Sequence, residues 1–163
     1  MKIESKFVYD NKTVLVVYED TDSFELLDPA KTKQAYGVCF YDDKIVIVLN
    51  GKKNTWGLVG GTIEKDESYE DCLIREIKEE SNMNVLKYKS IGYQAVYVDN
   101  KVSYQLRYFC TVEPYGDFIA DPDGEITEIK SINPEDYKQY FDWGEIGDRI
   151  MERAVEMREN YKL

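Results

Sequence analysis

The chain has 163 residues, the size of one ordinary domain, and its formal net charge of −11 opposes binding to a nucleic-acid polymer, which needs many Lys and Arg side chains. Histidine is absent, which excludes histidine-based triads and mixed His zinc sites and leaves acid–base work to carboxylates. The N-terminus lacks a signal-peptide core, no stretch approaches the roughly 18 apolar residues of a membrane span, and no CxxC pair occurs. We expect one domain over residues 1–163 that is cytoplasmic, contacts no membrane and keeps Cys39, Cys72 and Cys110 reduced and buried.

The first half of the chain predicts two β-hairpins, because β-branched and aromatic runs meet at short polar turns. The paired runs are residues 6–9 with 13–19 and residues 35–41 with 44–50. A short apolar strand in "TWGLV" then leads to Gly60 and Gly61. Two adjacent glycines permit a tight loop whose backbone approaches a ligand closely.

A helix is predicted from the residue after Ser68 to about Ser81. Ser68 is a good N-cap with Asp71 at the third helical position, which predicts a capping box. Asn82 follows the last turn, where it tolerates the left-handed conformation that often ends a helix. The apolar side of this helix is predicted to consist of Leu73, Ile74 and Ile77.

The same helix carries Glu76, Glu79 and Glu80 near its C-terminal end. Carboxylates at i, i+3 and i+4 repel one another, and the helix dipole disfavours anions there, at a cost on the order of 1–3 kcal/mol. One interpretation is a solvated acidic face in which Arg75 pairs with Asp71 and Glu79. The other is a divalent cation, which turns the repulsion into attraction because hard cations bind several oxygen ligands.

The second half of the chain predicts strands over residues 90–98, 103–112 and about 125–132, followed by helical segments over 133–141 and 144–160. Alternation along the second strand places Leu106, Tyr108 and Cys110 on one face and Gln105, Arg107 and Phe109 on the other. The last helix has an apolar stripe formed by Ile146, Ile150, Ala154 and Met157. The elements together indicate an α+β domain with antiparallel sheets packed around helices.

Residues 61–83 resemble the sequence box of the Nudix hydrolases. Gly61, five residues, Glu67 and seven further residues precede "REIKEESNM", which begins at Arg75. The fixed positions match except that Asn82 stands where the family has its last glycine, while Val59 and Asp66 replace a proline and a glycine that are common in the family. The resemblance implies an α/β/α sandwich with a mixed or antiparallel sheet around a central catalytic helix.

The resemblance also implies roles for individual residues. Mg²⁺ or Mn²⁺ would be the cofactor, bound by the Gly61 carbonyl and by the carboxylates of Glu76, Glu79 and Glu80. Glu67 and Arg75 would pair to hold the glycine loop against the helix. Glu79 and Glu80 would be catalytic, together with one carboxylate from outside the box, for which we choose Glu125 over Glu128. The implied reaction is attack of water on a phosphorus atom of a nucleoside diphosphate linked to another group.

The candidate substrate-binding residues are Lys52, Lys53, Trp56, Arg107 and Tyr108. The two lysines lie just before the box, where they either contact phosphate or form a solvated loop tip. Packing in the core or sheet is the default for the aromatic side chains, although one or two can stack on a base. Arg107 is a lone arginine in a strand, which fits phosphate or base recognition or a structural ion pair. The expected partner is a small nucleotide, and a homodimer is left open.

Two other functions compete with a metal-dependent pyrophosphohydrolase: a nucleotide-binding sensor without turnover, and a metal-buffering or structural domain. The complete set of acids favours the enzyme, because a retired site tends to lose charged ligands that are costly to keep together. Family members that act on ADP-ribose often carry a proline about fifteen residues after the box, and "YVDNK" has none. The reduced-dinucleotide and coenzyme A motifs are also absent, which favours nucleoside triphosphates, ordinary or oxidised.

Overall fold

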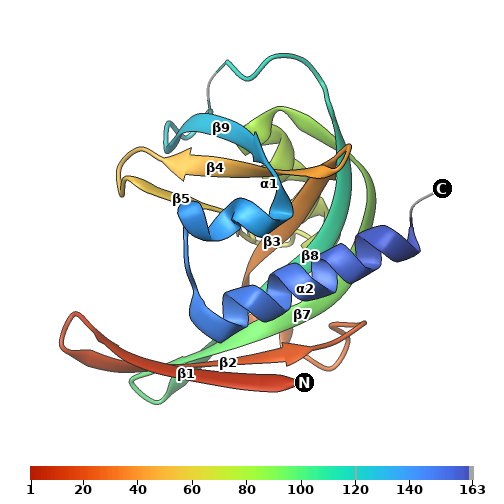
Figure 1. Cartoon of the computed structure of the whole chain (residues 1–163). Coiled ribbons are helices and arrows are strands. Elements are labelled where there is room, and N and C mark those ends of the chain that lie inside the picture. Colours follow the sequence, from red (N-terminus) through yellow and green to blue (C-terminus); the bar gives the residue numbers. More distant parts are fainter. Residues whose placement is uncertain (120, 162–163) are drawn as a thin grey trace.

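The strands form one mixed sheet in the computed structural model, which describes residues 1–119 and 121–161 (Figure 1). The strand order is β1-β2-β7-β8-β3-β4-β5, with β6 paired to β3 and β9 paired to β4. The pairs are antiparallel except β3 with β8, which is parallel. The strands are β1 (Lys2–Tyr9), β2 (Lys12–Asp20), β3 (Thr32–Tyr41), β4 (Lys44–Asn50), β5 (Thr55–Gly57), β6 (Val59–Thr62), β7 (Met83–Val98), β8 (Lys101–Pro114) and β9 (Ile126–Ile132).

Two helices cover opposite faces of this sheet. Helix α1 (Tyr69–Ser81) packs Leu73 and Ile77 into one buried cluster, and helix α2 (Gly144–Asn160) packs Ile146 and Ile150 into another. Figure 1 shows α2 in front of the sheet and α1 behind it. The arrangement is an α/β/α sandwich, which confirms the predicted fold. Short 3-10 helices occur at η1 (Pro29–Lys31) and at η2 (Pro134–Gln139), where the sequence predicted helix.

Strand β8 divides its side chains between the two layers as its alternation predicted. Leu106, Tyr108 and Cys110 belong to the buried cluster under α1, whereas Phe109 belongs to the cluster under α2. Because successive side chains point to opposite faces, Arg107 lies on the α2 side of the sheet. This strand therefore places a buried arginine on the opposite face from α1.

Three sequence predictions about local structure were incomplete or wrong. Strand β7 begins at Met83, directly after Asn82, and not near residue 90, because register shifts between Val85 and Lys87 and between Ser90 and Gly92 interrupt the alternation that would reveal it. The side chain of Ile74 is 41% exposed, so it lies at the edge of the apolar stripe and not within it. The hydroxyl of Ser68 accepts the Asp71 N–H at 3.0 Å, which gives one half of the predicted capping box.

The end of α1 and the cysteines agree with the sequence. Asn82 has φ 55° and ψ 38°, the left-handed conformation, and its side-chain amide donates to the Asp117 carbonyl at 2.9 Å. Cys39, Cys72 and Cys110 are free and buried. Among the described residues, none of the helices is long and apolar enough to span a membrane.

Candidate active site

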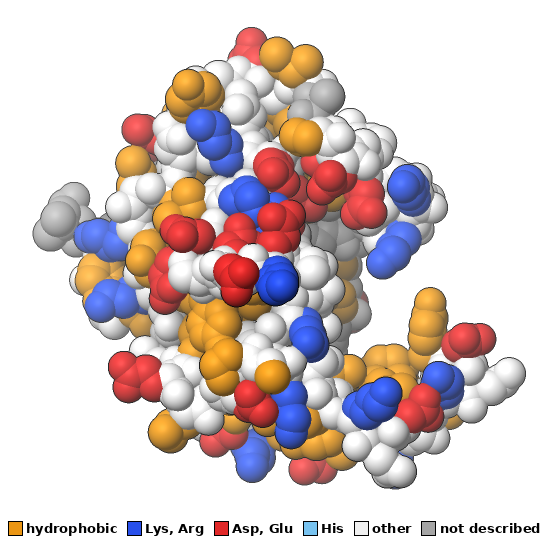
Figure 2. Space-filling model, turned by 180° about the vertical axis from the view of Figure 1, so that it is seen from behind, with side chains coloured by type: hydrophobic (Ala, Val, Ile, Leu, Met, Phe, Trp, Pro, Cys, Tyr) orange, Lys and Arg blue, Asp and Glu red, His pale blue; other side chains and the backbone are white. Residues whose placement is uncertain are grey.

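A cavity of about 1240 Å³ opens between the sheet, the start of α2 and the glycine loop of β6. Figure 2 shows the hollow between the main body and the hairpin of β1 and β2, with Asp and Glu side chains gathered on the body beside it. One end of the cavity is acidic. It is lined by Glu64, Glu76, Glu80, Asp121, Asp123 and Glu125.

Glu80 is the most perturbed carboxylate at this end. The residue is 8% exposed, and its Oε1 accepts the backbone N–H of Gly60 at 2.9 Å. Burial raises the pKa of Glu80 to about 8; the Gly60 hydrogen bond opposes this rise, and the charges of Glu76, Asp121 and Glu125 add to it. Glu80 is therefore a carboxylate that binds a proton readily near neutral pH.

The backbone of Gly61 lies directly against the carboxylate of Glu76. A Cβ at position 61 would come within 2.6 Å of the Glu76 Cδ and 2.7 Å of both its oxygens. Only glycine allows this approach, and the result is a cradle in which the Gly61 backbone lies against a buried carboxylate. Burial raises the pKa of Glu76, whereas the neighbouring Arg75 lowers it.

Arg75 organises the acidic side of α1. Its Nε and Nη2 donate to the two oxygens of Glu67 at 2.7 and 3.0 Å, and Nη2 also donates to the Thr62 carbonyl at 3.0 Å. Its Nη1 donates to Glu76 at 3.0 Å and to Glu79 at 3.2 Å. The Arg75 hydrogen bonds lower the pKa of Glu67 despite its partial burial. Arg75 thus fastens the loop before α1 to the helix and offsets part of the repulsion among the glutamates.

Glu79 shares one nitrogen of Arg75 with Glu76, because Arg75 Nη1 donates to both carboxylates. It lines a second, smaller cavity of about 440 Å³ on the other side of Arg75, together with Asn82 and Asp117. Across residues 1–119 and 121–161, no three Asp, Glu or Cys side chains stand together as a ready-made metal site. Of the residues expected at the site, Gly61, Glu76, Glu80 and Glu125 line the first cavity, whereas Glu79 lines the second and meets Glu76 at Arg75.

The donors at the acidic end nevertheless fit a hard divalent cation. They are carboxylate and carbonyl oxygens, which Mg²⁺ and Mn²⁺ prefer, and the cradle at Gly61 leaves the approach to Glu76 open. The raised pKa values of Glu76 and Glu80 show that negative charge there lacks sufficient compensation from the protein. A bound cation would supply that compensation.

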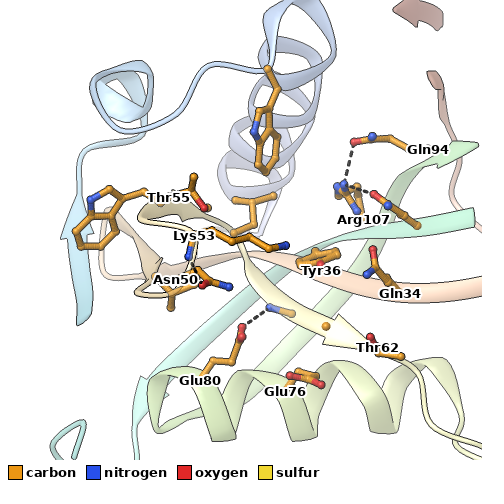
Figure 3. Close-up of a pocket in the computed structure, with 18 of the residues that line it drawn as sticks. Gln34, Tyr36, Asn50, Lys53, Thr55, Thr62, Glu76, Glu80, Gln94 and Arg107 are labelled. Carbon is orange, nitrogen blue, oxygen red and sulfur yellow. Dashed lines mark hydrogen bonds between the residues drawn. The ribbon is translucent and has the colours of Figure 1, made fainter. Parts of the chain in front are cut away.

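The opposite end of the cavity is built by glutamines around Arg107. Figure 3 shows Arg107 and Gln94 on the sheet, with Tyr36 and Gln34 between them and the glutamates of α1. Arg107 is 4% exposed and lies over the Tyr36 ring, with 4.9 Å between its Cζ and the ring centroid. Burial lowers the pKa of Arg107 to about 10, so it stays charged at neutral pH. In the part of the chain that the structure describes, it forms no ion pair with Asp or Glu.

The expected substrate-binding residues are divided between the cavity and other places. Lys53, Trp56 and Arg107 line the cavity. Lys52 is exposed and does not line it, and its backbone N–H donates to the side chain of Asn50. Tyr108 is buried on the α1 side of the sheet, where its ring packs against Phe24 with centroids 5.2 Å apart. We therefore remove Lys52 and Tyr108 from the candidate site.

Other lining residues were not predicted. They are Gln34, Tyr36, Gln94, Gln105, Asp121, Asp123 and Trp143. The alternation of β8 already placed Gln105 on the same face as Arg107, and the acidic loop before Glu125 signalled Asp121 and Asp123. The two oxygens of Asp121 accept the N–H groups of Asp123 and Ile126, so this loop is folded back on itself at the cavity edge.

A family model for the NUDIX domain matches residues 31–154. The chain belongs to the NUDIX family. It is a Nudix-type hydrolase, an enzyme that hydrolyses diphosphate bonds. A search of curated proteins found no match.

Solved structures support the same fold for this Nudix hydrolase. The pyrophosphohydrolase BsRppH of Bacillus subtilis, solved as a point mutant, is similar with a TM-score of 0.69 and 18% identity over 94% of this chain and 97% of that chain. A MutT NUDIX hydrolase of Burkholderia pseudomallei gives a TM-score of 0.57 and 14% identity over 74% and 95% of the two chains. An Ap4A hydrolase of C. elegans gives a TM-score of 0.59 and 14% identity over 78% of this chain and 98% of that chain.

Proposed function

We propose that this protein is a metal-dependent pyrophosphohydrolase that cleaves a small nucleotide in which a nucleoside diphosphate is linked to another group. The observation that carries the proposal is the buried Glu80 carboxylate, tied to Gly60 in a cavity that also presents Glu76 and Gly61. The names of the structural neighbours, which include a pyrophosphohydrolase and an Ap4A hydrolase, support phosphate anhydrides as the class of bond. A nucleoside triphosphate, ordinary or oxidised, is the proposed substrate class.

In this mechanism, the side chains of Glu76 and Glu80 and the Gly61 carbonyl would hold Mg²⁺ or Mn²⁺. The metal would screen the phosphate charge and acidify the attacking water when bound. Glu80 Oε1 accepts the Gly60 N–H, and Oε2, which has no hydrogen bond among the described residues, is the oxygen that would accept a proton from water. Glu125 lines the same cavity from its exposed rim and is the second candidate base.

The remaining site residues position these groups. Arg75 and Glu67 hold the glycine loop against α1. Glu79 as a metal ligand stays a prediction; its carboxylate accepts from the same Arg75 nitrogen as that of Glu76. The free, buried cysteines are compatible with the expected cytoplasmic location.

The test is hydrolysis of a panel of nucleoside diphosphate and triphosphate compounds with Mg²⁺, with Mn²⁺ and with chelator. We expect activity only with metal, and a loss of at least about 100-fold in kcat for Glu80→Gln, the scale of removing a major proton-transfer or electrostatic contribution. Glu128→Gln is the matched control, because Glu128 is exposed and outside the lining of the cavity. Nucleotide binding without turnover under all these conditions would favour the alternative function, a nucleotide sensor on the same fold.

A further inference from the structure

Arg107, Gln94 and Gln105 form a cluster in which the hydrogen-bond donors and acceptors are fixed. Arg107 Nη2 donates to Gln94 Oε1 at 2.8 Å and to Gln105 Oε1 at 3.2 Å, and Nη1 donates to the Leu106 carbonyl at 3.1 Å. A guanidinium has only donors, so both glutamine oxygens must point toward it. The amide nitrogens of Gln94 and Gln105 therefore point away from Arg107. The two glutamines line the cavity, and the orientation leaves N–H donors for a ligand there.

The neighbourhood of this donor cluster suits a flat, apolar ring. Val14, Val16 and Val96 line the cavity beside Gln94, and Val16 pairs with Val96 across β2 and β7. Gln34 also lines the cavity, and it lies opposite Gln105 in the β3–β8 register. These residues combine an apolar wall with carboxamide groups at its edge, which is the usual composition of a site that orients a small ring by a few hydrogen bonds.

The distance from the acidic end fits one nucleoside. Arg107 lies opposite Tyr36 in the β8–β3 register, and Tyr36 lies opposite Gly60 in the β3–β6 register. Two strand spacings amount to about 10 Å. This step rests on the proposed function, which places the diphosphate at Gly61 and the glutamates. A nucleoside attached to that diphosphate then extends across Tyr36 and brings its base to the glutamines.

We propose that Gln94 and Gln105, positioned by Arg107, select nucleotides whose base carries a keto oxygen. Guanine and hypoxanthine offer O6 and N7 as acceptors, and uracil and thymine offer O4, so each can accept from the outward amide groups. Adenine and cytosine present an amino group at the corresponding position, which sets donor against donor and leaves buried N–H groups unpaired. The substrate class is thereby narrowed to keto-base nucleotides.

A phosphate is a poorer fit for the same cluster. Both hydrogens of Arg107 Nη2 are directed to glutamine oxygens, Nη1 is bonded to a backbone carbonyl, and Nε is buried without a partner in the described chain. A ligand therefore meets neutral amide donors first and not the charged fork that binds phosphate in a bidentate manner. The guanidinium acts as a positioning group behind the glutamines.

The experiment compares dissociation constants by isothermal titration for IMP, GMP and AMP in the absence of divalent metal. IMP and AMP differ only at one edge of the purine ring. IMP carries a keto oxygen on C6 and a hydrogen on N1, whereas AMP carries an amino group on C6 and no hydrogen on N1. We expect IMP and GMP to bind the wild type at least about 10-fold more tightly than AMP, the scale of one good base contact. Because the readout is binding, a failure of hydrolysis does not affect it, and a failure of base selectivity leaves the metal-dependent reaction standing.

Gln94→Glu is the decisive variant. Glutamate keeps an oxygen for Arg107 but replaces the outward amide by an acceptor, so the preference for IMP over AMP should fall by at least about 10-fold. Gln105→Glu is the second variant if the first does not fold. Gln139→Glu, an exposed change outside the cavity lining, is the matched control and should keep the wild-type preference.

Three results would overturn the proposal. They are equal affinities of the wild type for IMP and AMP, an unchanged preference in folded Gln94→Glu or Gln105→Glu protein, and no detectable binding of any of the three monophosphates. A fourth result would also overturn it: displacement of all three equally by inorganic phosphate, weakened in Gln94→Glu, would show that the cluster binds an anion instead.

Discussion

The backbone N–H of Gly60 donates to Oε1 of Glu80 across 2.9 Å and so joins the glycine loop to the last turn of α1. The bond holds a carboxylate that is almost fully buried and whose pKa is raised to about 8, chiefly by that burial. A raised pKa means that the folded state favours the protonated acid. Protonated Glu80 therefore contributes its full stabilisation of the folded state at acidic pH, and this stabilisation is lost as the pH rises toward 8.

Glu80→Gln should therefore increase the metal-free stability at pH 8 by about 1–3 kcal/mol, with little effect at pH 4. Glutamine keeps an oxygen for the Gly60 N–H and removes the buried charge. Urea unfolding with chelator at both pH values measures the difference. A variant that was less stable than the wild type at both pH values would show that the ionised carboxylate makes a structural contribution.

Gly61→Ala should displace the Glu76 carboxylate, because its Cβ would lie 2.6 Å from the Glu76 Cδ. We expect a loss of about 1–3 kcal/mol in the free energy of unfolding and at least about 10-fold in kcat. Gly57→Ala is the control for stability, since its Cβ would make an ordinary contact of 3.8 Å with Trp143. Denaturant melts and steady-state rates of both variants test the expectation, which fails if Gly61→Ala behaves like Gly57→Ala.

Asn82→Ala should destabilise the protein by about 1–2 kcal/mol, because alanine adopts the left-handed conformation at a cost and cannot donate to Asp117. Asn82→Gly removes the conformational cost but also the hydrogen bond, so its stability should lie within about 1 kcal/mol of the wild type. Thermal melts of the two variants side by side give the comparison. The reverse order of stability would contradict the assigned role of the backbone conformation.

The ion pair of Asp20 with Arg149 should make stability depend on acidic pH. Burial alone would raise the pKa of Asp20, but hydrogen bonds and charge from Arg149 and the N-terminal ammonium outweigh it and lower the pKa. The stabilisation is present above the unfolded pKa of about 3.9 and is lost as the pH falls below it. Asp20→Asn should cost about 1–3 kcal/mol at pH 7 and much less near pH 2.

Urea titrations at the two pH values provide the measurement for Asp20→Asn. Asp99→Asn is the matched control, because Asp99 pairs with Lys12 at an exposed site where a pair contributes at most about 1 kcal/mol. An equal loss at pH 7 and pH 2 for Asp20→Asn would exclude the ion pair as its cause.

Local signals in the sequence predicted the elements but only part of the site. The hairpin turn at Asp99 and Asn100 sets the register that brings Gln94 opposite Gln105, and both turn residues have positive φ. Both glutamines were therefore accessible from the strand pattern and the turn. Gln34 and Tyr36 were not, because their place depends on the parallel pairing of β3 with β8, for which no short sequence signal exists.

The position of the acidic helix was predicted correctly, but the hydrogen bonds that stabilise its glutamates were predicted only in part. The sequence suggested that the repulsion among Glu76, Glu79 and Glu80 is relieved either by a divalent cation or by Arg75 pairing with Asp71 and Glu79. In the structure, Arg75 bonds to Glu76 and Glu79, and Glu80 bonds to Gly60. Side-chain rotamers decide which oxygen meets which donor, and residue spacing does not contain that information.

The parallel pairing of β3 with β8 also has a consequence for folding kinetics. It joins residues about seventy positions apart, as in Gln34 with Gln105, and closing so long a loop makes a late, slow step compared with forming α1 or the hairpin of β7 and β8. The glutamines of β7 and β8 and the glycine loop beside β3 come together only at that step. We therefore expect the cavity in which a nucleotide can bind to form after α1 and the hairpin of β7 and β8 during folding.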